Sequence, residues 1–245
     1  MQYSPPLIQG TLIKRYKRFL ADVECPHLGR SLTVHCPNPG RMEGLSTPGT
    51  PIWIWDSQNP KRKLRYSLEL VEDPEGALVV VNTMRANQVI HEALTLGLMP
   101  DFDRSTVRTE VPWMGTHTSR LDFQLVNAQG QTAFVEVKSV TYLPDFNRHQ
   151  GIVAFPDAVT SRGTKHLNTL CEIQQSGIQA INLFLACRSD ATAVTTAGHI
   201  DPQYSSALDS VLNHGVQVLA YRMAISVDGL DLGPKIPFIR SMTHE

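Results

Sequence analysis

The first third of the chain alternates hydrophobic and polar positions in short segments, which turn residues separate. Alternation with a period of two, together with β-branched and aromatic residues, predicts β-strands. Clusters of Pro, Gly, Asn and Asp between the segments predict tight turns. The predicted strands span residues 7–23, 30–35, 51–55, 64–71 and 77–81. About five short strands in this length favour a small closed barrel of the OB-fold type.

The pattern changes after Asn82, where helical and strand-like segments follow one another. Apolar residues at helical spacing predict helices, and glycines close them. The predicted helices span 87–96, 162–176 and 201–213. The predicted strands span 107–113, 120–126, 132–140, 180–187 and, as the last one, 216–225. We therefore expect two domains, an all-β barrel at 1–82 and an α/β domain with a mixed sheet at 83–245.

The composition is that of a soluble protein. Hydrophobic residues make up 42% of the 245 residues, and no apolar run is long enough to span a bilayer. The first residues show neither the basic nor the apolar region of a signal peptide. None of the four cysteines forms a C-x-x-C pair, which argues against a zinc knuckle and for reduced thiols. We expect a cytoplasmic protein with no membrane partner.

The charge of the chain suggests a binding partner only through local clusters. The formal net charge is −1, with +2 on residues 1–82 and −3 on residues 83–245. A global field of this size does not attract a polyanion, so nucleic acid would have to be bound by clusters of cations. Two clusters in the first domain interleave cations with aromatic residues. Their cations are Arg15, Lys17 and Arg18, and Lys61, Arg62 and Lys63.

These clusters allow two interpretations. OB-type barrels bind nucleic acid through cationic grooves and aromatic stacking. The alternative is a solvated sheet edge that Lys and Arg protect from aggregation. Trp53 and Trp55 lie on one side of a predicted strand, where they are either stacking surfaces or part of the core.

A predicted hairpin in the second domain brings acidic residues together. A three-residue loop at 128–130 would place Gly130 where the turn requires a positive φ. In that register Asp122 lies opposite Glu136, and Lys138 shares their face because it is two residues further along the strand. The other face is predicted to carry apolar residues that pack on a core. These are Leu121, Phe123, Leu125, Val135 and Val137.

Two chemistries are compatible with this face of the hairpin. Carboxylates this close repel each other unless a cation lies between them, and hard divalent ions prefer oxygen ligands. Asp122 and Glu136 would then bind Mg²⁺ or Mn²⁺, and Lys138 would orient a water or neutralise charge on a phosphate. The alternative is a cross-strand salt bridge on a half-exposed sheet. Spacing alone leaves both open.

Two further segments allow a functional and a structural interpretation. Glu92, in the middle of a predicted helix, could add a third carboxylate or lie on a solvated helix face. Arg162, Lys165 and His166 lie near a predicted helix start, where anions bind readily. They would contact phosphate there, or would be solvated charges beside a helix cap.

Several motifs in this order resemble the SfsA family of sugar fermentation stimulation proteins, and the resemblance covers nearly the whole chain. The block at 155–167, which reads Phe-Pro-Asp-Ala-Val-Thr-x-Arg-Gly-x-Lys-His-Leu, is the most specific of them. The others are His35–Met42 (HCPNPGRM), Asn82-Thr83 with Asn87, Ser119–Phe123 (SRLDF), Val135–Thr141 (VEVKSVT), and His199-Ile200-Asp201-Pro202-x-Tyr204.

The resemblance implies an N-terminal OB-fold and a C-terminal domain similar to PD-(D/E)XK restriction endonucleases. In the nuclease-like pattern, the residues for metal and chemistry fall on Asp122, Glu136 and Lys138, and the helix carboxylate falls on Glu92. Leu121 stands where the superfamily has its eponymous proline. DNA contacts are then expected from cations of both domains. They are Arg15, Lys17, Arg18, Arg41, Lys61, Arg62, Lys63, Arg162, Lys165 and His166.

The resemblance also implies a function. It predicts a DNA-binding protein with little sequence preference, which contacts mainly the phosphate backbone, and a role in regulating genes of sugar (maltose) metabolism. An active Mg²⁺- or Mn²⁺-dependent nuclease acting on DNA or RNA is the first alternative. A sugar-responsive binding protein is a further one, although no residue set has the pattern of a sugar site. A homodimer is compatible with the sequence, which does not fix the oligomeric state.

Overall fold

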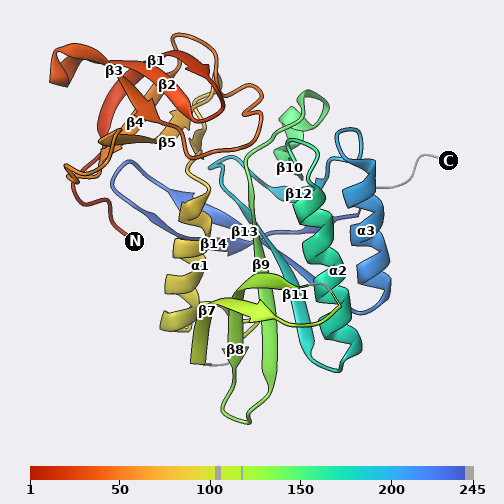
Figure 1. Cartoon of the computed structure of the whole chain (residues 1–245). Helices are drawn as coiled ribbons and strands as arrows, with labels where there is room; N and C mark the ends of the chain where they lie inside the picture. Colours follow the sequence, from red (N-terminus) through yellow and green to blue (C-terminus); the bar gives the residue numbers. More distant parts are fainter. Residues whose placement is uncertain (103–105, 117, 241–245) are drawn as a thin grey trace.

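A computed structural model describes residues 1–102, 106–116 and 118–240 (Figure 1). The first domain is a β-barrel whose strands follow the order β3-β2-β1-β4-β5-β6. Pairing of β3 with β5, at His35 and Ser67, closes it. Its strands are β1 (Ile8–Tyr16), β2 (Leu20–Cys25), β3 (Arg30–His35), β4 (Pro51–Asp56), β5 (Tyr66–Glu72) and β6 (Leu78–Val80), with a short 3-10 helix η1 (Pro26–Leu28). The predicted OB-type barrel is confirmed.

One predicted strand is in fact a hairpin. The segment expected at 7–23 divides into β1 and β2, which pair with each other in antiparallel fashion. The turn between them contains Lys17 and Arg18, which have φ values of 47° and 62°. Residues with side chains rarely adopt this left-handed conformation, and the tight hairpin turn usually contains Asn or Gly. The usual sequence signal for a turn is therefore missing here.

The second domain is a mixed sheet covered on both faces. In the described part of the chain its main sheet has the order β14-β13-β11-β9-β8-β7. Strands β9, β11 and β13 are parallel, and the others are antiparallel to their neighbours. Helix α1 (Met84–Leu96) covers one face, and α2 (Ser161–Gln175) and α3 (Pro202–Asn213) cover the other (Figure 1). The strands are β7 (Thr106–Trp113), β8 (Ser119–Val126), β9 (Thr132–Val140), β11 (Gln179–Ala186), β13 (Gln217–Ile225) and β14 (Leu230–Lys235).

The predicted α/β domain is therefore confirmed, but the sequence missed four strands. A small parallel sheet consists of β10 (Ile152–Phe155), β12 (Ala193–Thr196) and β15 (Phe238–Ile239). The prediction that 216–225 is the last strand is wrong, because β14 and β15 follow it. These strands are short or, like β14, poor in apolar residues, so their sequences carry little periodic signal. A second 3-10 helix, η2 (Asp145–Gln150), precedes β10.

One of the three hydrophobic clusters among the described residues joins the two domains. Trp53, Leu70 and Val80 of the barrel pack in the same buried cluster as residues of α1 and of strands β8, β9, β11 and β13. Trp53 is therefore core rather than a stacking surface for bases. Trp55 is also engaged, because its Nε1 donates to the carbonyl of Ser4 and the Arg85 guanidinium lies over its ring.

Polar contacts fix the domains further. The backbone N–H of Val80 donates to the carbonyl of Cys187 at 2.9 Å, and that of Ser189 donates to Leu78 at 2.9 Å. Beside them, the buried Arg188 of the second domain donates to the buried carboxylate of Asp73 in the barrel at 2.5 Å. Hydrogen bonds and a buried ion pair thus reinforce the shared core, and the barrel has a fixed position over α1.

Two further observations concern the cysteines and the possibility of a membrane span. All four cysteines are free thiols. Among the described residues, no helix is both long and apolar enough to cross a membrane.

The shared core predicts that the domains unfold together. Leu70→Ala removes a fully buried side chain from this core and should lower the free energy of unfolding by about 2–5 kcal/mol. Urea denaturation followed by both fluorescence and circular dichroism measures it. Leu98, which is 60% exposed, is the control, and Leu98→Ala should change that energy by less than about 0.5 kcal/mol. Separate transitions for the two domains in the unmodified protein would contradict a common core.

Candidate functional site

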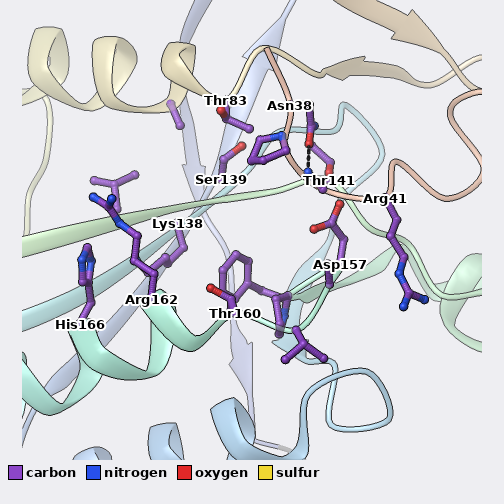
Figure 2. Close-up of a pocket in the computed structure, with 18 of the residues that line it drawn as sticks. Asn38, Arg41, Thr83, Lys138, Ser139, Thr141, Asp157, Thr160, Arg162 and His166 are labelled. Atoms are coloured by element: carbon purple, nitrogen blue, oxygen red, sulfur yellow. Dashed lines mark hydrogen bonds between the residues drawn. The ribbon is translucent and has the colours of Figure 1, made fainter. Parts of the chain in front are cut away.

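A pocket with a volume of about 910 Å³ lies where the two domains meet. Its wall on the barrel side comes from β1 and from the loop at 38–41. Its opposite wall comes from α1, β8, β9, the segment at 155–160 and the start of α2. Figure 2 shows residues from both walls turned towards this space. Nearly every motif on which the family resemblance rests contributes to it.

The β8–β9 hairpin has the predicted register as far as its ladder extends. Leu125 pairs with Ala133, and Gly130 has a φ of 77° in the turn. The ladder ends at Phe123 and Val135, one position before Asp122 and Glu136 would pair. The Asp122 carboxylate lies at the point where the two strands part. Its Oδ2 accepts the backbone N–H of Val137 at 2.7 Å.

The end of this ladder also breaks the alternation of β8. Phe123 and Leu125 pack in the core shared with α1, as predicted, whereas Leu121 packs in the cluster beneath α2 and α3. The prediction that all three side chains face the same way is wrong. The break coincides with Glu110 on the neighbouring strand β7, which has a φ of 52°. Asp122 is turned by this break towards α1, where Asn87 Nδ2 donates to its Oδ1 at 2.7 Å.

Glu136 is more deeply buried than Lys138 and His166, the two side chains that contact it. Its side chain is 4% exposed, and its Oε1 accepts from Lys138 Nζ at 2.6 Å. The same oxygen forms a hydrogen bond with Nδ1 of His166 on α2. Its second oxygen, Oε2, is buried and has no hydrogen-bond partner among the described residues. A buried carboxylate oxygen without a partner is costly, which makes this atom a natural ligand for a cation.

The two carboxyl groups differ in their proton affinity. Burial, and secondly the negative charge of Glu136, raise the pKa of Asp122 to about 6. Burial also acts to raise the pKa of Glu136, but Lys138 and His166 outweigh it and hold that pKa below its usual range. Glu136 is therefore ionised over the whole neutral range, whereas Asp122 exchanges a proton just below it.

The structure corrects the predicted role of Glu92. Its side chain lies outside the pocket and forms an ion pair with the amino group of Met1 at 2.7 Å. Five residues earlier on α1, the side chain that contacts Asp122 is the amide of Asn87. Helix geometry explains the difference, because residues five apart on a helix lie on different faces. Asn87 carries no charge, so no pattern of acidic residues could have identified it.

The predicted DNA contacts divide into two groups. Arg15, Arg18, Arg41, Arg162 and His166 line the pocket. Arg15 also has a structural role, since its guanidinium donates to the carbonyls of Asn38, Gly40 and Arg41. The other group lies outside the pocket lining. It consists of Lys17, Lys61, Arg62, Lys63 and Lys165, of which Arg62 donates to Ser67.

A loop of the barrel is docked against the second domain at the pocket. The Asp157 carboxylate accepts the backbone N–H of Met42, and it packs on Gly40 so closely that a Cβ there would lie 1.9 Å from Oδ2. Glycine is therefore required at position 40. Burial raises the pKa of Asp157. The sequence contained both halves of this contact, but nothing in it indicated that they meet.

The helix cap that was predicted as the structural alternative at the start of α2 is present as well. Thr160 caps the helix, accepting the N–H of Gly163 at 3.0 Å, and its own N–H donates to Asp201 Oδ2 at 2.8 Å. The cap and the pocket are compatible, because Arg162 and His166 extend from the same end of α2 towards the strand that carries Lys138 (Figure 2).

The chemistry of the donor set fits a hard cation with few protein ligands. Among the described residues, no group of three or more His, Cys, Asp or Glu side chains is close enough to hold a metal ion. Mg²⁺, however, commonly takes only one or two carboxylates and keeps several waters. Asp122 and the free Oε2 of Glu136 satisfy that requirement. A salt bridge alone would leave Oε2 without a partner.

Comparisons with known proteins agree with this architecture. The family model described as "Sugar fermentation stimulation protein RE domain" matches residues 84–229, and "SfsA N-terminal OB domain" matches residues 13–81. A "Sugar fermentation stimulation protein homolog" of Aeromonas salmonicida is 42% identical over 97% of this chain and 96% of its own length. One of Pseudomonas paraeruginosa is 43% identical over 97% and 99%.

A solved structure has the same fold. It is described as "The structure of Pyrococcus Furiosus SfsA in complex with Ca2+", and it superposes with a TM-score of 0.86 over 98% of each chain. The two sequences are 22% identical, so this likeness supports the fold alone.

Titration of Asp122 tests the electrostatics of the site. In metal-free protein, carboxyl ¹³C NMR should give a midpoint near pH 6, against an ordinary value of 3.8. Because the folded state binds this proton more tightly, the stability contributed by Asp122 is complete below pH 3.8 and is lost as the pH rises through 6. Glu136→Gln removes the neighbouring charge and should lower the midpoint. A midpoint near 4 in the unmodified protein would contradict the described burial.

Proposed function

The chain belongs to the family of sugar fermentation stimulation proteins, SfsA, and we propose that it is a DNA-binding protein whose pocket holds a divalent cation and a phosphodiester. The observation that carries this proposal is the arrangement around Glu136. A buried, ionised carboxylate with one free oxygen lies beside Asp122 and under the ammonium of Lys138. Such a set supplies ligands for a cation and a positive charge for a phosphate.

The proposed cation is Mg²⁺ or Mn²⁺, held by Asp122 and Glu136. Both ions favour carboxylate oxygen over nitrogen and sulfur. Asn87 and the N–H of Val137 orient the Asp122 carboxylate, and His166 and Lys138 orient that of Glu136. The Pyrococcus relative is described as a complex with Ca²⁺, another hard cation with a preference for oxygen.

The proposed partner is DNA, bound mainly through its phosphates. The net charge of −1 gives no long-range attraction, but Arg18, Arg41 and Arg162 line the same pocket as the two carboxylates. Contacts to phosphate position a nucleic acid without reading its sequence. A protein that binds in this way has little sequence preference. Regulation of sugar (maltose) metabolism genes, which the family name suggests, is a proposal that rests on this binding.

Cleavage of the bound phosphodiester is the second candidate, and the position of Lys138 favours it. When bound, the cation would polarise the phosphate and activate a water. Lys138, 11% exposed and held by Glu136 at 2.6 Å, can neutralise charge that develops on the phosphate oxygens.

Cation binding distinguishes the site residues from their neighbours. Calorimetry with Mn²⁺ should show that Glu136→Gln weakens binding by at least about tenfold, because it removes one charged ligand. Glu92→Gln is the matched control, and it should leave the affinity unchanged since Glu92 lies outside the pocket. Incubation of the same two variants with plasmid and single-stranded DNA in Mn²⁺ tests whether the protein cleaves DNA at this site. Cleavage that survives Glu136→Gln would rule out this site as its source.

DNA binding is tested by its dependence on salt. Arg162→Ala should weaken binding similarly for all DNA sequences. The plot of log K against log [salt] should also become less steep, by about 0.9 or less for each phosphate that the variant no longer neutralises. Lys165→Ala, three residues further along the same helix but outside the pocket, is the control and should change neither quantity. Equal effects of the two variants would place the DNA on the outer surface of α2. No binding at low salt would refute the proposed function.

A further inference from the structure

The pocket is small in comparison with double-stranded DNA. A sphere of its volume would be roughly 12 Å across, no wider than the major groove of B-DNA alone, which is about 12 Å. An intact duplex can therefore lie across the mouth of the pocket but cannot enter it. The barrel cannot move aside easily, because the shared core, the Asp73–Arg188 ion pair and the contact of Asp157 with Gly40 fix its position.

The groups that would act on a phosphodiester lie inside this space rather than at its mouth. Taken as whole residues, backbone included, Glu136 is 3% exposed and Lys138 9% exposed. Direct contacts of a phosphate with Lys138 need a separation of about 3 Å between nitrogen and oxygen. The phosphodiester must therefore enter the pocket, and a strand without its complement can bring both its phosphates and its bases into this space.

The cations of the pocket are placed to guide one strand. Arg18 lies at the tip of the β1–β2 hairpin, Arg41 on the docked loop and Arg162 on the first turn of α2. Figure 2 shows Arg41 and Arg162 on opposite sides of the pocket. Across the described residues, none of these three guanidinium groups has a hydrogen bond or an ion pair with a side chain or a carbonyl. They are available to the phosphates of a strand that passes between the two domains.

An apolar wall faces the same space. The segment between β10 and α2 contributes Phe155, Pro156, Ala158 and Val159 to the lining. Val159 is 71% exposed although it is hydrophobic. In a duplex the faces of the bases are hidden by stacking, whereas an unpaired base presents an apolar face that such a wall can cover. Phe155 also packs against the core through Phe184 and Tyr204, whereas the exposed Val159 has no such role among the described residues.

We propose that this pocket takes an unpaired strand of DNA, with the phosphates on Arg18, Arg41 and Arg162 and an unpaired base against Val159. The substrate class is single-stranded DNA or the single-stranded overhang of a duplex, rather than continuous double helix. This inference rests on the proposed function and adds to it the form of DNA that the site accepts.

Fluorescence anisotropy on the full chain in Mg²⁺ tests it, with three labelled probes of the same sequence. They are a single strand, a blunt duplex, and a duplex with a five-nucleotide overhang. The single strand and the overhang should bind at least about tenfold more tightly than the blunt duplex, because only they can place an unpaired base against Val159 while their phosphates contact the arginines. Arg18→Ala and Val159→Ser should each reduce that preference to less than about threefold. Met114→Ser changes another exposed hydrophobic residue, 82% exposed and outside the pocket, and should leave it unchanged.

The outcomes separate this inference from the proposed function. Equal or tighter binding of the blunt duplex would overturn the inference and leave a DNA-binding protein. A preference for single strands that survives both Arg18→Ala and Val159→Ser would overturn it too, because the strand would then lie elsewhere. Absence of binding to all three probes would overturn both proposals. Circular dichroism of each variant confirms that a reduced preference does not come from unfolding.

Discussion

The burial of two carboxylates side by side is the constraint on which the site depends. Burial and the charge of Glu136 raise the pKa of Asp122 to about 6, so this arrangement costs the protein stability. Every polar contact of the pair reduces that cost. Asn87 and the N–H of Val137 donate to Asp122, and Lys138 and His166 contact Glu136. The Oε2 atom of Glu136 has no hydrogen-bond partner among the described residues, and a bound cation would supply one.

The barrel matters to this site because it is fixed rather than tethered. If the two domains were joined only by a linker, the space between them would vary and could not orient a ligand. Instead, Trp53, Leu70 and Val80 pack into the core of the second domain. The barrel also contributes the loop at 38–42, which Asp157 holds against the segment that leads into α2. The pocket is therefore a property of the whole chain and of neither domain alone.

Net charge is a poor guide to this protein. A chain with a formal charge of −1 still has several arginines in one pocket, because the hairpin tip, a loop and a helix start all contribute to its lining. Cations that looked equivalent in the sequence are not equivalent in space. Lys61 and Lys63 remain on the outer surface of the barrel, and Arg15 is used to hold the loop. Function depends on which charges share a space that water and ligand can enter.

The sequence by itself determined the two-domain architecture, the register of the β8–β9 hairpin and the approach of Glu136 and Lys138 to each other. These features follow from local rules, because alternation, turn residues and counting along two strands involve near neighbours. Only the tertiary structure decided that Asn87 rather than Glu92 contacts Asp122, that His166 contacts Glu136, and that Trp53 belongs to a core shared by both domains. Those contacts join segments that are distant in the chain, and no local pattern encodes which of many compatible partners will meet.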